Sequence, residues 1–157
     1  MRVRMNSEVY QHQVQELNKK LRHHFSHLLR IEFDHFHITD MQYNVLSAID
    51  EHDGITIGEL AKMLQQDAGN MSNLLKKLER LAYVIRTRSA IDERVINLHL
   101  SKDGRHCVKT INAKIQTYYE KEWNRYNDKD KEIILHGLTK LNQFFESFLD
   151  KEEHDGE

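Results

Sequence analysis

The sequence contains no proline and only one cysteine, Cys107, among its 157 residues. Without proline, nothing in the sequence forces a kink in a long helix. A single cysteine excludes a disulfide framework within the chain. No apolar run approaches the roughly 20 residues that a membrane-spanning helix needs, and residues 1–13 lack the apolar stretch of a signal peptide. We therefore expect a cytoplasmic protein that does not associate with a membrane.

The composition indicates a globular chain of one domain. Hydrophobic residues make up 39% and charged residues 31% of the sequence, which allows a sizeable core in a chain of this length. The sequence has no G-x-S-x-G, no phosphate-binding glycine loop and no pair of carboxylates in a recognisable setting. It therefore predicts neither enzyme activity nor a bound cofactor.

Residues 67–81, DAGNMSNLLKKLERL, predict an amphipathic helix with two different faces. One face is an apolar stripe at helical spacing, formed by Met71, Leu74, Leu75, Leu78 and Leu81. The other carries amides, a hydroxyl and cations, namely Asn70, Ser72, Asn73, Lys76, Lys77 and Arg80. Such groups can contact both the base edges and the phosphates of DNA. Taken alone, such a segment is more often an ordinary helix with a solvated face, so the neighbouring segments must decide.

The segment before this helix favours DNA binding. Thr56 and Glu59 fit a capping box that begins a short helix. The apolar face of that helix consists of Ile57, Leu60, Ala61 and Leu64. Asp67 can cap the helix that follows. Two short helices joined by a tight turn make a helix-turn-helix.

The segment after this helix predicts a hairpin wing. Residues 83–88 and 94–100 are expected to be strands joined by residues 89–93, because apolar and polar side chains alternate along the second.

The distribution of charge along the sequence also favours DNA binding. Although the whole chain has a net charge of −2, residues 69–94 contain six cations and three anions, a net charge of +3. The attraction to DNA depends on the charge of this local patch and not on the net charge of the whole chain. Residues 150–157 are acidic, and we assign them no role.

In these features the sequence resembles the MarR family of winged-helix transcriptional regulators, named for multiple antibiotic resistance. The resemblance rests on three stretches: residues 60–61 with 74–79 (LLKKLE) in the helix-turn-helix, Asp92-Glu93-Arg94 as a D-x-R wing, and residues 98–104 (LHLSKDG) as L-x-L-[ST]-x-x-G. Two positions depart from the family pattern. Ala82 stands where glycine is usual, and Gln66 stands where an apolar residue is usual. If position 82 is left-handed, alanine costs more there than glycine.

Four further helices complete the predicted fold. They are residues 8–34, residues 40–52 with Thr39 as cap, a helix from Ser101 to about Tyr126, and a last helix capped by Asn127 or Asp128. The fold class is therefore mainly α with a small β wing (α+β), in a single domain over residues 1–157. Residues 39–100 form the winged helix-turn-helix, and residues 1–38 and 101–157 form dimerisation helices. Alternatively, these long apolar helices could pack only against one another within one chain, as an intramolecular bundle.

The resemblance implies a homodimeric repressor that binds double-stranded DNA at a palindromic operator. Residues 68–80 would enter the major groove. The candidates for base edges are Asn70, Ser72 and Asn73, and those for phosphates are Lys76, Lys77 and Arg80. The resemblance places Arg94 in the minor groove and gives Asp92 the role of orienting the wing, while Arg86 and Arg88 could add phosphate contacts. It also implies an effector pocket between the dimer helices and the winged helix, whose small-molecule ligand would release DNA.

Two alternative functions stay open. The first is a zinc-responsive regulator of the same fold, because His23, His24 and His27 share a helix and His35 and His37 follow; we nevertheless expect no metal site. Stoichiometric zinc in the purified protein would favour this alternative. The second is a winged-helix module that binds proteins instead of DNA, which a lack of duplex binding at low salt would favour. We expect Cys107 to be a small buried hydrophobe and not a redox sensor.

Overall fold

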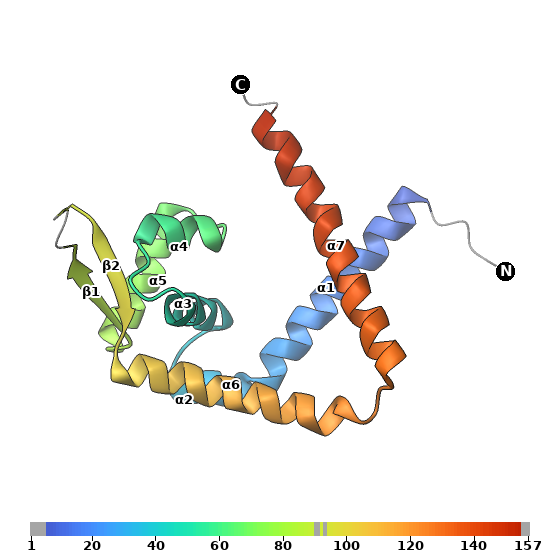
Figure 1. Ribbon diagram of the computed structural model, residues 1–157, viewed down its shortest axis with the longest axis horizontal. Coiled ribbons are helices and arrows are strands. Elements are labelled where there is room, and N and C mark those ends of the chain that lie inside the picture. Colours follow the sequence, from blue (N-terminus) through green and yellow to red (C-terminus); the bar gives the residue numbers. More distant parts are fainter. Residues whose placement is uncertain (1–5, 90–91, 93, 155–157) are drawn as a thin grey trace. The chain divides into compact units, whose positions relative to one another are not determined.

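The computed structural model describes residues 6–89, 92 and 94–154, with side chains as far as residue 148, and is mostly helical (Figure 1). In chain order the elements are α1 (Ser7–Leu28), α2 (Arg30–Phe36), α3 (Asp40–Glu51), α4 (Ile57–Met63), α5 (Ala68–Arg80), β1 (Val84–Arg88), β2 (Ile96–Leu100), α6 (Lys102–Trp123) and α7 (Asp128–His154). The chain divides into two compact units, residues 1–115 and 116–157. The predicted fold class, mainly α with a small β wing, is confirmed.

The single helix predicted for residues 8–34 is wrong, because the backbone leaves helical geometry at Leu29. This residue has φ of −101° and ψ of 6°, and it separates α1 from α2. Leu29, Phe33 and Phe36 are buried, whereas α1 contains no buried residue. The change of direction brings the apolar side of α2 into the core. Burial of these side chains therefore accounts for a break that neither proline nor glycine marks in the sequence.

Side-chain caps begin each helix of the helix-turn-helix, as predicted. Thr39 leads a capping box at α3, and Thr56 leads another with Glu59 at α4. Hydrogen bonds from the Thr56 backbone and hydroxyl lower the pKa of Glu59. Asp67 caps α5. α3, α4 and α5 lie together beside the β1–β2 hairpin (Figure 1). Their buried apolar side chains and those of β2 form a core that includes Val45, Leu46, Ile49, Leu60, Met71, Leu75, Leu78 and Leu98.

The wing is an antiparallel hairpin in which Val84 lies opposite Leu100. Its strands begin later than predicted, at Val84 instead of Tyr83 and at Ile96 instead of Arg94, where ladder pairing starts. The other edge of β2 pairs with residues 54–56. The Gly54 amide donates to the Leu98 carbonyl, and the Leu98 amide donates to the Ile55 carbonyl, both at 2.9 Å. The base of the wing is therefore attached to the loop between α3 and α4.

The junction between α5 and β1 depends on one left-handed residue. Ala82 has φ of 58°, and the Tyr83 amide donates to the Leu78 carbonyl at 2.9 Å, which is the hydrogen bond of a Schellman motif. The predicted strain of alanine at this position is thus present. Gly104 in α6 lies so close to the Tyr83 carbonyl that a Cβ atom there would overlap it. The predicted cap of α6 is also found, since the Ser101 hydroxyl accepts from the Gly104 amide at 3.0 Å.

The unit from residue 116 onward consists of the end of α6 and the whole of α7. α6 ends at Trp123, earlier than the predicted Tyr126, and Asn127 caps α7 as predicted by accepting the Asp130 amide at 2.9 Å. Lys131 lies over the Trp123 ring, 3.7 Å from its centroid. Among the described helices, none is long and apolar enough to cross a bilayer.

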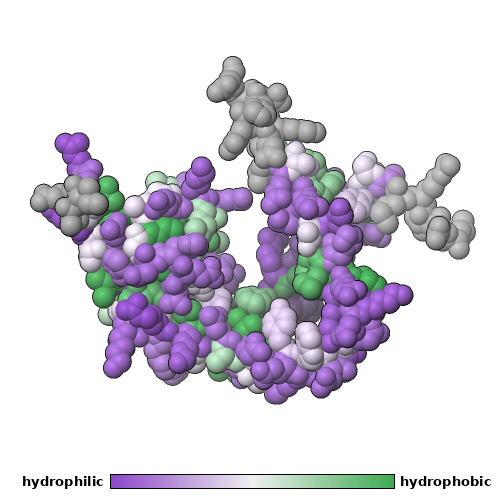
Figure 2. Space-filling model, in the orientation of Figure 1, coloured by the Kyte–Doolittle hydropathy of each residue, from purple (hydrophilic) through white to green (hydrophobic). Residues whose placement is uncertain are grey.

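Large apolar side chains remain exposed on three helices. On α1 they are Leu17, Leu21, Phe25 and Leu28, and on α6 and α7 they include Tyr119, Trp123, Ile134, Leu138, Phe145 and Phe148. Figure 2 shows hydrophobic residues at the surface among the hydrophilic ones. On α6, Val108 and Ile111 are buried, whereas Tyr119 and Trp123 are exposed. The remaining apolar faces are available to a partner.

Candidate nucleic-acid interface

α5 has the two faces that its sequence predicts. Met71, Leu75 and Leu78 are fully buried, whereas Leu74 and Leu81 at the edges of the stripe are half-buried. The opposite face is exposed at Asn70, Asn73, Lys76, Lys77 and Arg80, and Ser72 is half-buried. The helix therefore presents amides near its N-terminus and cations towards its C-terminus. This order places hydrogen-bonding groups and positive charges on one surface.

The Asn70 side chain is held by the residue that caps the helix. One oxygen of the Asp67 carboxylate accepts the Asn70 backbone amide at 2.8 Å, and the other accepts the Asn70 side-chain amide at 2.5 Å. Hydrogen bonds to an ionised acceptor are stronger than neutral ones. Of the three candidates for base contacts, Asn70 thus has a defined orientation before any ligand binds.

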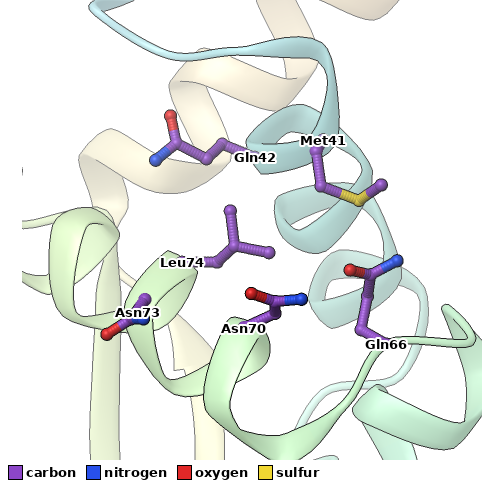
Figure 3. Close-up of a pocket in the computed structure, with 6 residues that line it drawn as sticks. All are labelled: Met41, Gln42, Gln66, Asn70, Asn73 and Leu74. Carbon is purple, nitrogen blue, oxygen red and sulfur yellow. The ribbon is translucent and has the colours of Figure 1, made fainter.

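A shallow hollow of about 350 Å³ lies between the start of α3 and the start of α5. Its lining residues are Met41, Gln42, Gln66, Asn70, Asn73 and Leu74, so four of the six are amides (Figure 3). Gln42 is buried and its oxygen accepts the Thr39 amide at 3.0 Å. Sequence analysis did not include Gln42 or Gln66 among the site residues. The only signal was that Gln66 is polar where the resembled family is usually apolar.

The six predicted cations do not have equal surroundings. Lys76, Lys77 and Arg80 are exposed, and they form no ion pair with another described residue. Arg88 at the end of β1 is exposed as well. Arg86 instead forms an ion pair with Glu79 in the last turn of α5. Its charge is therefore partly neutralised within the protein, which spacing along the sequence did not reveal.

The turn of the wing is organised by Asp92. Its carboxylate accepts the Arg94 backbone amide at 2.9 Å, and its carbonyl accepts the Val95 amide at 2.9 Å. The Ser89 amide in turn donates to the Val95 carbonyl at 2.9 Å. The Arg94 side chain is exposed. Ala90, Ile91 and Glu93, the middle residue of the D-x-R stretch, lie outside the described residues, as do the side chains of the acidic tail from residue 150 onward.

His99 connects the wing to the helix-turn-helix and was not among the predicted site residues. Its Nδ1 lies 3.0 Å from the Asp53 carboxylate, and its Nε2 lies 3.0 Å from the Thr87 hydroxyl on β1. A carboxylate accepts hydrogen bonds only, so Nδ1 carries a proton and donates to Asp53. The contact joins both strands to the α3–α4 loop. The wing is thereby fixed relative to the helices both by backbone hydrogen bonds and by side-chain hydrogen bonds.

The sequence offers two alternative sites, the histidines of α1 and Cys107. The rings of His23 and His27 stack with centroids 6.3 Å apart, and His24 lies 5.9 Å from His23. In the part of the chain that the structure describes, no three His, Cys, Asp or Glu side chains are grouped as metal ligands. Cys107 is buried as predicted, and its burial raises the pKa of the thiol to about 12.

Comparison with known proteins identifies relatives of this chain. The sequence model of the MarR family matches residues 38–94. The chain is 33% identical over 97 residues to the HTH-type transcriptional regulator SarZ of Staphylococcus aureus (strain USA300). That match covers 62% of this chain and 63% of SarZ, so the similarity extends over less than two thirds of the relative.

Two solved structures with bound DNA are similar in fold and sequence. Streptococcus pneumoniae FabT in complex with DNA is 28% identical with a TM-score of 0.73, over 86% of this chain and 99% of FabT. The MepR–DNA complex of S. aureus is 26% identical with a TM-score of 0.64, over 83% of this chain and 98% of MepR. Both likenesses extend beyond the winged helix to the flanking helices.

Proposed function

The chain belongs to the MarR family, and from this premise we propose that it is a transcriptional regulator that binds double-stranded DNA. The observation that carries the proposal is α5, whose buried apolar face fixes the helix while its exposed face presents Asn70 and Asn73 followed by three exposed cations. FabT and MepR were solved with DNA, and SarZ is a named transcriptional regulator. A regulatory function also agrees with the prediction that the chain is not an enzyme.

Each residue of the proposed interface has a role that follows from its chemistry. Amides and hydroxyls can read base edges in the major groove, which suits Asn70, Ser72 and Asn73. Phosphates attract Lys76, Lys77, Arg80 and Arg88. We assign the minor groove to Arg94, with Asp92 holding the backbone of the turn from which this arginine extends. Arg86 makes a smaller contribution to phosphate binding than the other cations, because it is paired with Glu79.

We further propose that the protein is a homodimer. Exposed apolar faces on α1, α6 and α7 support this assignment, since patches of this kind on a folded chain mark association surfaces. A two-fold axis would repeat the recognition helix, so the DNA site would be palindromic. As a repressor, the dimer would occupy this operator until a small-molecule effector favours a conformation with a different spacing of the two recognition helices.

The test is selection of bound duplexes from a random pool with the purified full-length protein. We expect enrichment of an inverted repeat and binding that weakens steeply as salt rises, because phosphate contacts release counterions. If no duplex is enriched and none binds at low salt, the DNA-binding function is overturned. A protein partner would then be the better explanation of the winged helix.

A further inference from the structure

Asp67 uses both oxygens of its carboxylate on one residue. The first oxygen caps α5 through the Asn70 backbone amide, and the second accepts the Asn70 side-chain nitrogen. Capping alone needs one oxygen. Thr39 and Thr56 cap α3 and α4 through a single hydroxyl each, and serine caps a helix about as well as aspartate. The second hydrogen bond is therefore not needed to begin the helix.

The charge of Asp67 strengthens this argument. In the proposed function, the N-terminus of α5 approaches DNA, where a carboxylate meets the repulsion of the phosphates. A neutral cap would avoid this repulsion. Residue 67 is exposed, so burial does not demand an acid there either. A carboxylate differs from a hydroxyl in two ways: it carries a negative charge, which the partial positive charge at the helix N-terminus favours, and it has a second acceptor atom.

That second acceptor determines which way the Asn70 amide faces. An ionised carboxylate only accepts hydrogen bonds, so the nitrogen of Asn70 must lie towards Asp67. The Asn70 oxygen and the second N–H form no hydrogen bond with any residue that the structure describes. In Figure 3 the nitrogen of Asn70 lies on the side of Gln66 and its oxygen on the side of Asn73. One acceptor and one donor are thus presented together on an exposed side chain.

This pair matches one base in the major groove. Adenine offers the N6 amino group as donor and N7 as acceptor, whereas guanine offers two acceptors. We propose that Asp67 is a positioning residue that orients Asn70 to read adenine at one position of each half-site. This inference rests on the proposed DNA-binding function and assigns base specificity within it. Asparagine–adenine pairs discriminate against other bases on the order of 10- to 100-fold.

Asn73 provides the matched comparison. It lies one turn further along α5, is exposed, and has no hydrogen bond from its side chain to any described residue. Its amide is therefore free to turn, and Asp67 does not orient it. A change at Asp67 should alter the preference for the base that Asn70 contacts and leave the preference at the Asn73 position as it is.

The experiment measures affinity of the full-length protein for the selected operator and for duplexes that carry each of the other base pairs at each position. The variants are Asn70→Ala, Asn73→Ala, Asp67→Ser and Asp67→Asn. Both Asp67 variants retain a capping oxygen, and circular dichroism verifies their helix content. We expect Asn70→Ala to abolish an adenine preference of about 10- to 100-fold at one position. Both Asp67 variants should reduce the preference at that same position several-fold and leave the others unchanged.

Four outcomes separate the claims. If the wild-type protein selects an operator but the Asp67 variants keep its base preferences, the positioning role is overturned. A loss of affinity that is equal for all duplexes also overturns it, because that is the result of a structural cap. If Asn70→Ala changes a position that does not prefer adenine, the base assignment is wrong. Failure of the wild-type protein to select any duplex overturns the proposed function itself.

Discussion

Arg86 on β1 and Glu79 in the last turn of α5 form an ion pair that joins the wing to the recognition helix. About a third of each side chain is exposed, at 33% and 32%. Pairs with this exposure contribute about 0–1 kcal/mol to stability. The larger consequence is electrostatic, because the pair removes one positive charge and one negative charge from the surface that would face DNA.

Replacing Glu79 should therefore strengthen DNA binding. Glu79→Gln leaves the Arg86 charge unpaired, so affinity for any duplex should rise at low salt, and the log–log salt slope should steepen by up to about one per subunit. Arg86→Ala should change the slope less than loss of an unpaired cation does. Fluorescence anisotropy over a salt series measures both. An unchanged affinity and slope for Glu79→Gln would show that Arg86 remains unavailable to phosphate even when unpaired.

The salt dependence of binding tests the exposed cations directly. Lys76→Ala should reduce the log–log salt slope by about one per subunit, since one phosphate contact fewer releases fewer counterions. Lys19→Ala on α1 is the matched control, because it removes the same charge from an exposed helix outside the winged helix. If Lys76→Ala weakens binding without a change in slope, its role is structural and not a phosphate contact.

The helix starts of this chain could be predicted because capping is local. Thr39, Thr56, Asp67, Ser101 and Asn127 all act as the sequence indicated, and each bonds within three residues of itself. The break at Leu29 could not be predicted in this way. It depends on burial of α2, where the Phe36 ring lies against His106 far along the chain, and no local signal accompanies it.

The composition of the candidate interface could also be predicted, but its pairings could not. Helical spacing was enough to place Asn70 and Lys76 opposite the buried stripe. The Glu79–Arg86 pair depends on where β1 lies relative to α5, and the His99 contacts depend on the α3–α4 loop. Such contacts between elements arise only when the fold is complete.

The wing arginine should be needed for binding and dispensable for folding. Arg94 is exposed, and its backbone amide donates to the Asp92 carboxylate in the turn. Arg94→Ala should therefore weaken DNA binding strongly, while circular dichroism and the unfolding midpoint stay unchanged. Arg94→Lys is the matched variant, since it keeps the charge but loses the planar guanidinium. Wild-type affinity in Arg94→Ala would remove this residue from the interface.

Ala82 offers a test of backbone strain that does not involve DNA. Its φ of 58° is left-handed, a conformation that glycine adopts without a steric penalty. Ala82→Gly should raise the free energy of unfolding by about 0.5–1 kcal/mol, after the greater freedom of glycine in the unfolded chain is included. In contrast, Ala113→Gly within α6 should lower it by about 0.5–1 kcal/mol. Urea titrations of both variants measure the free energy of unfolding. A loss of stability in Ala82→Gly would contradict the proposed strain.

The spacing of the two half-sites tests the symmetric dimer. If two subunits associate through the exposed apolar helices, their recognition helices face the same side of a duplex, with half-site centres roughly 10 base pairs or 34 Å apart. Inserting about five base pairs between the half-sites turns one of them to the far side of the duplex. The wing cannot follow this rotation, because backbone pairing with residues 54–56 and the His99 contacts fix it to its own subunit. Binding should therefore fall towards the non-specific level, and equal affinity for the native and half-turn sites would exclude a two-fold arrangement of recognition helices.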